Sequence, residues 1–164
     1  MAGPGRAQAA RLIALLLPLA LLAGAFGSQY LGGLYPCEMC WWQRYAHGAA
    51  VILAALAFTG PAASTRSRSL TLLAALAIAV SGAIGVYHAG VELKIFEGLT
   101  TCATTAKATS TAELLKKLMK VPLIRCDQVQ WSFLGISMAG WNAIISLSGV
   151  AAVAWLTLTA RRAR

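Results

Sequence analysis

The chain has 164 residues, a length typical of one domain. Hydrophobic residues make up 59% of it and charged residues only 12%, whereas a soluble domain carries about 25% charged residues. The net charge of +9 would suit a nucleic-acid partner, but the basic residues lie at the ends of apolar runs and form no stripe, so we expect no nucleic acid to bind.

Four apolar runs are long enough to cross a bilayer as helices, because a crossing needs about 20 residues. They comprise residues 12–30, 41–59, 70–91 and 133–159. These runs lack the alternation of membrane strands, and only helices or closed barrels satisfy the backbone in lipid. We therefore predict an all-α membrane protein, a four-transmembrane-helix bundle that forms one domain over residues 1–164.

The first run also resembles a signal peptide. Arg6 and Arg11 precede it, and Ala23-Gly-Ala25 resembles a cleavage site. The apolar core is long for a signal peptide and three further runs follow, which favours a retained helix.

The loops carry different charges on the two sides of the predicted bundle. Both termini and the turn at residues 61–69 are purely basic, whereas outer loops at about 31–40 and 92–132 hold all five acidic residues. Lys and Arg number seven on each side, so their count alone does not set the orientation. The purely basic segments favour the cytoplasm, and the cysteines agree because disulfides persist outside the cytosol.

The second outer loop contains a predicted surface helix. Ser110-x-x-Glu113 is a capping box, leucines such as Leu114 and Leu118 recur at helical spacing with lysines between them, and Pro122 ends the run. We expect a short amphipathic helix on the membrane surface. A solvated helix packed on the loop itself is the alternative.

All four cysteines lie at membrane edges, with Cys37 and Cys40 in a C-x-x-C motif and Cys102 and Cys126 in the second outer loop. A zinc site would need a closer second pair, so we expect no metal. Structural disulfides are the stronger alternative, since a Cys102–Cys126 bridge closing a loop of about 25 residues would contribute roughly 3.5 kcal/mol. The short Cys37–Cys40 ring constrains little chain, which favours a disulfide that opens and closes.

Two further residues are candidates for chemistry. Arg44 lies one helical turn after Cys40, where it can stabilise a thiolate or donate to a ligand carbonyl, or simply extend toward lipid headgroups. His88 lies near the outer end of the third run, where it can bond a ligand carbonyl or pair with backbone or Glu92.

The ordered set of motifs resembles the DsbB family of disulfide bond formation proteins. The matching segments are Pro36-Cys37-x-x-Cys40-x-x-x-Arg44, Tyr87-His88-Ala-Gly-Val-Glu92 followed by Cys102, and Cys126 followed by Trp131-Ser-Phe-Leu-Gly-Ile-Ser-Met-Ala-Gly-Trp-Asn142. Many members of that family carry Glu just before the arginine, where this chain has Gln43.

The resemblance implies a quinone-dependent oxidoreductase of the bacterial inner membrane, with cytoplasmic termini and periplasmic cysteine loops. It implies that Cys102–Cys126 is attacked by a reduced periplasmic thioredoxin-fold partner, DsbA, with Cys102 forming the mixed disulfide. Cys126 then attacks Cys37, and Cys40 leaves as a thiolate beside ubiquinone or menaquinone. Arg44 and His88 match residues at the family's quinone.

Two other functions fit the same pattern of cysteines. One is a membrane scaffold with two structural disulfides, and the other is a relay that reduces periplasmic disulfides by running electrons outward. Bound quinone would exclude the first, and the direction of electron flow would separate the second.

Overall fold

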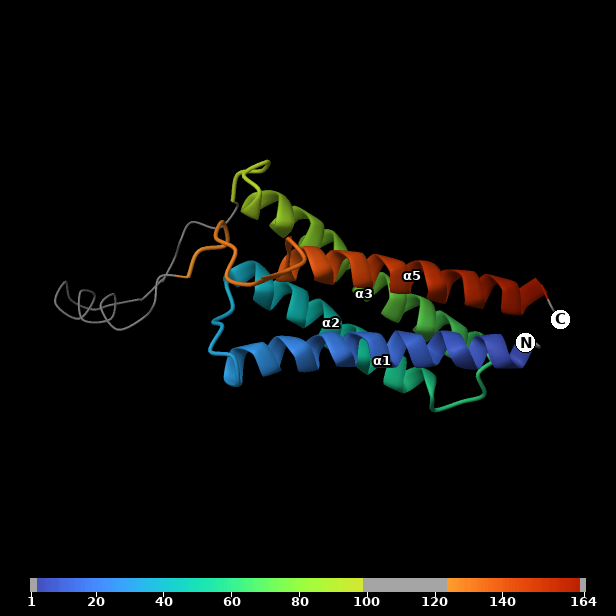
Figure 1. The fold of residues 1–164 in the computed structure, drawn as a ribbon. Coiled ribbons are helices and arrows are strands. Elements are labelled where there is room, and N and C mark those ends of the chain that lie inside the picture. The colour runs from blue at the N-terminus through green and yellow to red at the C-terminus, as the bar shows by residue number, and fades with distance from the viewer. Residues whose placement is uncertain (1–2, 99–123, 163–164) are drawn as a thin grey trace, which may run out of the picture.

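The computed structural model describes residues 3–98 and 124–162. Within them, four helices run side by side along the length of the molecule (Figure 1). They are α1 (Gly3–Tyr30), α2 (Glu38–Ala57), α3 (Thr65–Glu92) and α5 (Met138–Arg162). Cys102 and the predicted surface helix at residues 110–120 lie outside the described residues.

Three of these helices are long and apolar enough to cross a membrane, namely α1, α3 and α5. These three helices contain most of the first, third and fourth runs that the sequence predicted to cross. Within the described chain α2 does not reach the same hydropathy, because Gln43, Arg44 and His47 lie in its first half. A crossing by α2 therefore stays a prediction.

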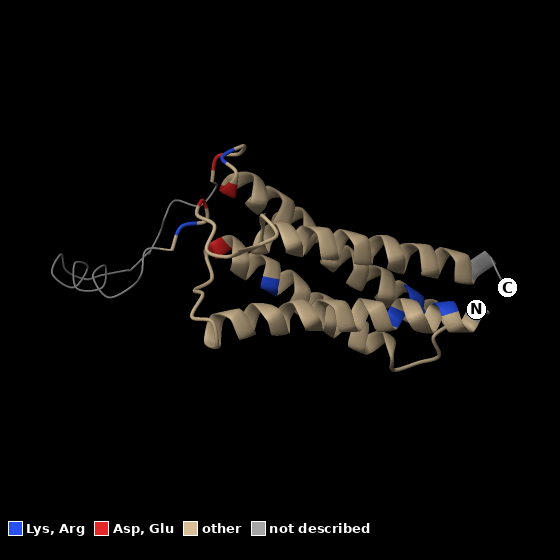
Figure 2. Cartoon of the chain, in the orientation of Figure 1, with Lys and Arg blue, Asp and Glu red and all other residues tan. Residues whose placement is uncertain are grey.

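Charge separates the two ends of the bundle. Both termini lie at one end, where the coloured segments are all basic, whereas the acidic segments lie toward the opposite end together with further basic ones (Figure 2). We call these the basic end and the cysteine end, since Cys37 and Cys40 begin α2 at the latter.

The bundle buries many small side chains and exposes many large apolar ones. Its core includes Ala10, Ala14, Ala54 and Ala74, which are at most 1% exposed. Large apolar side chains such as Trp155, which is 62% exposed, face outward. Small residues at helix contacts and exposed apolar surfaces are typical of helices packed in lipid.

Helices α3 and α5 pack against each other closely at two glycines. A β-carbon added to Gly85 would lie 3.0 Å from the Ala139 carbonyl oxygen and 3.1 Å from the Ala143 nitrogen. One added to Gly82 would lie 3.1 Å from Leu147 side-chain atoms. The first contact is with backbone, which has little freedom to move aside.

A small hairpin precedes α5. Strands β1 (Ser132–Phe133) and β2 (Ile136–Ser137) pair antiparallel, and the turn residues Leu134 and Gly135 have φ of 52° and 77°. Two positive φ values are typical of a tight hairpin turn. The helix therefore begins at Met138, whereas the sequence placed the start of the fourth span at Phe133.

Replacing Gly85 with alanine should destabilise the bundle. The added methyl group meets the backbone of α5, so we expect a loss of about 1–3 kcal/mol in the free energy of unfolding, as for other overpacked sites. Denaturant unfolding in detergent micelles measures it. Gly24→Ala is the matched control, because nothing lies within 4 Å of a β-carbon there. Equal stability of the two variants would contradict the close contact.

Candidate active site

The C-x-x-C motif forms the start of α2. Cys37 is the N-cap residue in an extended conformation, and its sulfur accepts a hydrogen bond from the Cys40 amide at 3.4 Å. Cys40 therefore lies in the first turn, where the amides and dipole of the helix favour negative charge. This placement is typical of reactive cysteines.

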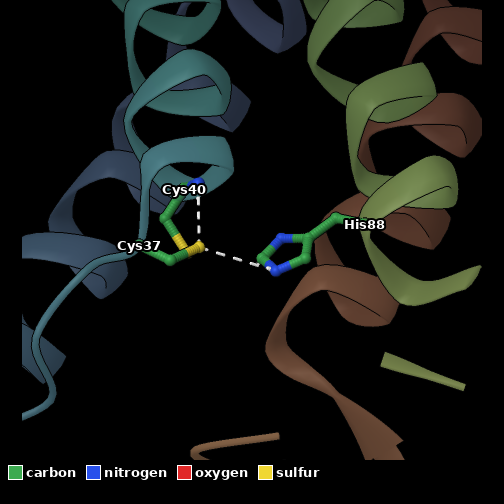
Figure 3. Close-up of side chains that lie close together, drawn as sticks. All are labelled: Cys37, Cys40 and His88. Atoms are coloured by element: carbon green, nitrogen blue, oxygen red, sulfur yellow. Dashed lines mark hydrogen bonds between the residues drawn. The ribbon is translucent and has the colours of Figure 1, made fainter. Parts of the chain in front are cut away.

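The two sulfur atoms face a histidine from the neighbouring helix. Cys37 Sγ lies 3.0 Å from Cys40 Sγ and 3.6 Å from His88 Nε2 of α3 (Figure 3). His88 is 3% exposed, and its distance of 3.9 Å to Glu92 exceeds that of a hydrogen bond. The predicted alternative of a His88–Glu92 pair is thus the weaker contact.

Cys126 packs against the C-x-x-C motif. It forms one buried cluster with Cys37, Met39 and Val91. Hydrogen bonding with the sulfurs of Cys126 and Cys40, together with burial, raises the pKa of the Cys37 thiol far above its usual value. The fold therefore brings together one cysteine from each predicted pair.

Charged residues hold the Cys126 segment against the end of α3. Lys94 Nζ lies 2.7 Å from Asp127 Oδ2, and it also donates to the Asp127 carbonyl oxygen at 2.8 Å. Arg125 donates two further hydrogen bonds to the same carboxylate. Hydrogen bonds from Arg125 and Lys94 hold the pKa of Asp127 well below its ordinary value, so it stays ionised at neutral pH.

Arg44 reaches from α2 to α1. It donates hydrogen bonds to the Ala25 carbonyl oxygen at 2.9 Å and to Gln29 Oε1. Its guanidinium also lies 4.9 Å from the ring centre of Phe26 and 5.0 Å from that of Trp41. With the residue only 8% exposed, this arrangement disfavours an arginine that extends into headgroups. These contacts leave other guanidinium N–H groups to meet a ligand.

A cavity of about 610 Å³ lies beside these residues. Residues of α1, α2, α3 and α5 and of the loops at the cysteine end line it. Its wall includes Cys37, Cys40, Arg44 and His88, four of the six predicted site residues. Cys126 packs next to Cys37 instead, and Cys102 lies outside the described residues.

The sequence analysis missed a group of buried and half-buried polar residues next to this cavity. Asn142 of α5 bonds Gln43 and His47 of α2, at 2.8 Å each, and Ser81 of α3 at 3.2 Å. Polar residues inside apolar runs are expensive in lipid and are functional candidates by default. That signal was present in the sequence at His47 and Asn142.

Comparisons with known proteins point to one family. The model of the family described as disulfide bond formation protein DsbB matches residues 7–156. A protein named disulfide bond formation protein B from Marinobacter nauticus is 31% identical over 132 residues, covering 76% of each chain. A protein of the same name from Xanthomonas oryzae pv. oryzae is 29% identical, and the match covers 81% of this chain and 80% of that protein. Another, from a Shewanella strain, is also 29% identical, and the match covers 80% of this chain and 75% of that protein. No solved structure matches.

Removing the Lys94 charge should loosen the Cys126 segment. In a background where the other cysteines are serine, Lys94→Met should speed maleimide modification of Cys126 by up to about fivefold, the scale of an exposed ion pair. Mass spectrometry follows the reaction. Arg66→Met, at the exposed start of α3 near the basic end, is the control and should leave the rate unchanged. If Lys94→Met left the rate of Cys126 modification unchanged, the ion pair between Lys94 and Asp127 would not be what positions Cys126.

Proposed function

The chain belongs to the DsbB family of membrane disulfide bond formation proteins, and on that premise we propose that it oxidises a periplasmic DsbA-like dithiol protein with a membrane quinone. In this reaction two partner thiols become a disulfide and the quinone becomes a quinol. Two electrons and two protons pass from the thiols to the quinone, so no other oxidant is needed.

The position of the cavity supports quinone binding there. A quinone head group is a planar ring with two carbonyl oxygens, and it supplies a two-electron acceptor when bound. The cavity offers Cys40 and the Arg44 guanidinium in the same wall, together with apolar residues from α1. In the proposed site Arg44 binds a carbonyl oxygen and Cys40 faces the ring. Ubiquinone and menaquinone are both candidates.

The contact between Cys37 and Cys126 supports exchange between the two pairs. In the proposed cycle the partner attacks Cys102, and Cys126 then attacks Cys37 and releases the Cys40 thiolate. The helix N-terminus and Arg44 stabilise that thiolate. Two independent structural disulfides, as in a scaffold protein, would not require a cysteine of one pair to pack against the other.

The charges of the two ends support the proposed orientation. We place the basic end in the cytoplasm and the cysteine end in the periplasm of a bacterial inner membrane. Thiol exchange with a periplasmic partner then takes place on the side where disulfides persist.

Quinone reduction by the purified protein tests the function. With a reduced thioredoxin-fold partner, the wild-type protein should form one quinol for each partner disulfide. Arg44→Met should raise the quinone KM by roughly ten- to hundredfold, since a charge-assisted hydrogen bond contributes about 1.5–3 kcal/mol. Arg44→Lys should restore part of the affinity, because lysine keeps the charge but not the planar fork. Absorbance of the quinone follows the reaction.

A control separates quinone binding from the contact between α1 and α2. Gln29→Leu removes an α1 partner of Arg44 but keeps the guanidinium. Reduced stability in both variants, with a raised KM only in Arg44→Met, is the expected result. An unchanged quinone KM in a folded Arg44→Met protein would show that Arg44 does not bind the quinone. Electron flow from quinol to the partner protein would instead favour the relay that reduces periplasmic disulfides.

Cys126→Ser tests the order of exchange. The partner is supplied with one active-site thiol, carrying thionitrobenzoate as a leaving group. The Cys102 thiol displaces that group and forms a mixed disulfide, and without Cys126 no neighbouring thiol resolves it, so it should accumulate. Non-reducing gel electrophoresis detects it, and the Cys102→Ser variant should give none. A folded Cys126→Ser protein that never traps the partner would favour structural disulfides.

A further inference from the structure

The side-chain amide of Gln43 has a fixed orientation. Gln43 Nε2 lies 3.2 Å from the carbonyl oxygen of Met39, one turn earlier in α2, and that oxygen only accepts hydrogen bonds. Nitrogen must therefore occupy this position, because the amide oxygen would face another oxygen there. The second hydrogen of the same Nε2 points to His88 Nδ1 at 3.1 Å.

Asn142 fixes the other end of the amide. Its Nδ2 donates to Gln43 Oε1 at 2.8 Å and to the Ser81 carbonyl oxygen at 3.3 Å. A rotated Asn142 would place its oxygen against these two acceptors. The main-chain carbonyls of Met39 and Ser81 thus set the direction of donation through both amides.

The direction of donation determines where His88 carries its hydrogen. Since Gln43 donates to Nδ1, that nitrogen is an acceptor, and the neutral imidazole carries its hydrogen on Nε2. Nε2 is the nitrogen that lies 3.6 Å from Cys37 Sγ. His88 therefore presents an N–H group to the sulfur of Cys37.

We propose that Gln43 is a positioning residue that holds His88 in the Nε2–H tautomer, so that His88 acts on the cysteine pair as a hydrogen-bond donor. The donor stabilises negative charge on the Cys37 sulfur whenever thiol exchange places it there. This role rests on the proposed function, since it matters only if the pair exchanges. Glutamate at this position would have no hydrogen to donate when ionised.

The same tautomer disfavours a metal ion. By distance alone Cys37, Cys40 and His88 could hold one, because their ligand atoms lie within 4.8 Å of one another. A metal bound through Nε2 needs the hydrogen on Nδ1, where a carboxylate or carbonyl normally accepts it. Gln43 presents a donor at that point, so it does not support the tautomer that a metal would need.

Nitrogen NMR of ¹⁵N-histidine-labelled, reduced protein tests the tautomer directly. The chain has two histidines, and the signals lost in His88→Asn assign His88. We expect wild-type His88 to carry hydrogen on Nε2 and none on Nδ1. A wild-type His88 with its hydrogen on Nδ1 would overturn the inference without any variant.

Gln43→Glu provides the second measurement, because it replaces the hydrogen-bond donor that faces His88 Nδ1 with an acceptor. Nδ1 of His88 should gain a hydrogen, and the zinc affinity of the reduced protein should rise by about 10- to 100-fold, the usual scale for an outer-shell partner of a metal ligand. Competition with a chromogenic chelator measures the affinity. Gln8→Glu makes the same change on α1 near the basic end, beside Arg11, and should match wild type in both measurements. Equal zinc affinity of wild type and a folded Gln43→Glu protein would contradict the inference.

Both measurements are made without quinone, so they separate the two proposals. A protein with the Nε2–H tautomer that reduces no quinone overturns the proposed function and supports the geometry inferred for His88. A protein that reduces quinone but carries hydrogen on Nδ1 supports the function and overturns the role of Gln43.

Discussion

The close approach of α3 and α5 is the constraint on which the cysteine end depends. Gly82 and Gly85 remove the side chains that would separate the two helices. Asn142 can then contact both α2 and α3 and join Gln43 to Ser81. In an apolar bundle each buried polar group needs a partner, because lipid offers none. Asn142, Gln43 and Ser81 therefore belong to one connected group of hydrogen bonds that ends at His88 and Cys37, separate from the contacts of Arg44 with α1.

The two halves of the bundle are held together in different ways. Toward the basic end, alanines such as Ala10 and Ala74 let the helices meet with little side-chain volume between them. Toward the cysteine end, polar contacts and a cavity replace that packing. Interhelical hydrogen bonds add specificity where close packing is interrupted. The sequence reflects this division, since the first half of α2 is the least apolar part of the four helices.

The sequence predicted the elements that follow from local pattern. Apolar runs of sufficient length indicated the helices, and the C-x-x-C spacing with Arg44 one turn later indicated a reactive helix start. It did not predict the hairpin at residues 132–137, because an apolar run continues through Phe133 and Leu134. Nor did it predict the partners of Gln43, since the directions of side chains on three different helices are set only by packing.

The two cysteines of the C-x-x-C motif have different surroundings, and this difference gives the proposed cycle a direction. Cys37 is 4% exposed and lies among Cys126, His88 and Met39, so it is placed to exchange with another cysteine. Cys40 is less buried, lies in the first turn of α2 and shares the cavity wall with Arg44. The thiolate is therefore favoured on Cys40, in the first turn of α2 beside Arg44, while the protonated thiol is favoured on Cys37, which also lines the cavity but packs against Cys126. A protein that passes electrons from thiols to a membrane acceptor needs this asymmetry, because the sulfur that reaches the acceptor must be the one left with the charge.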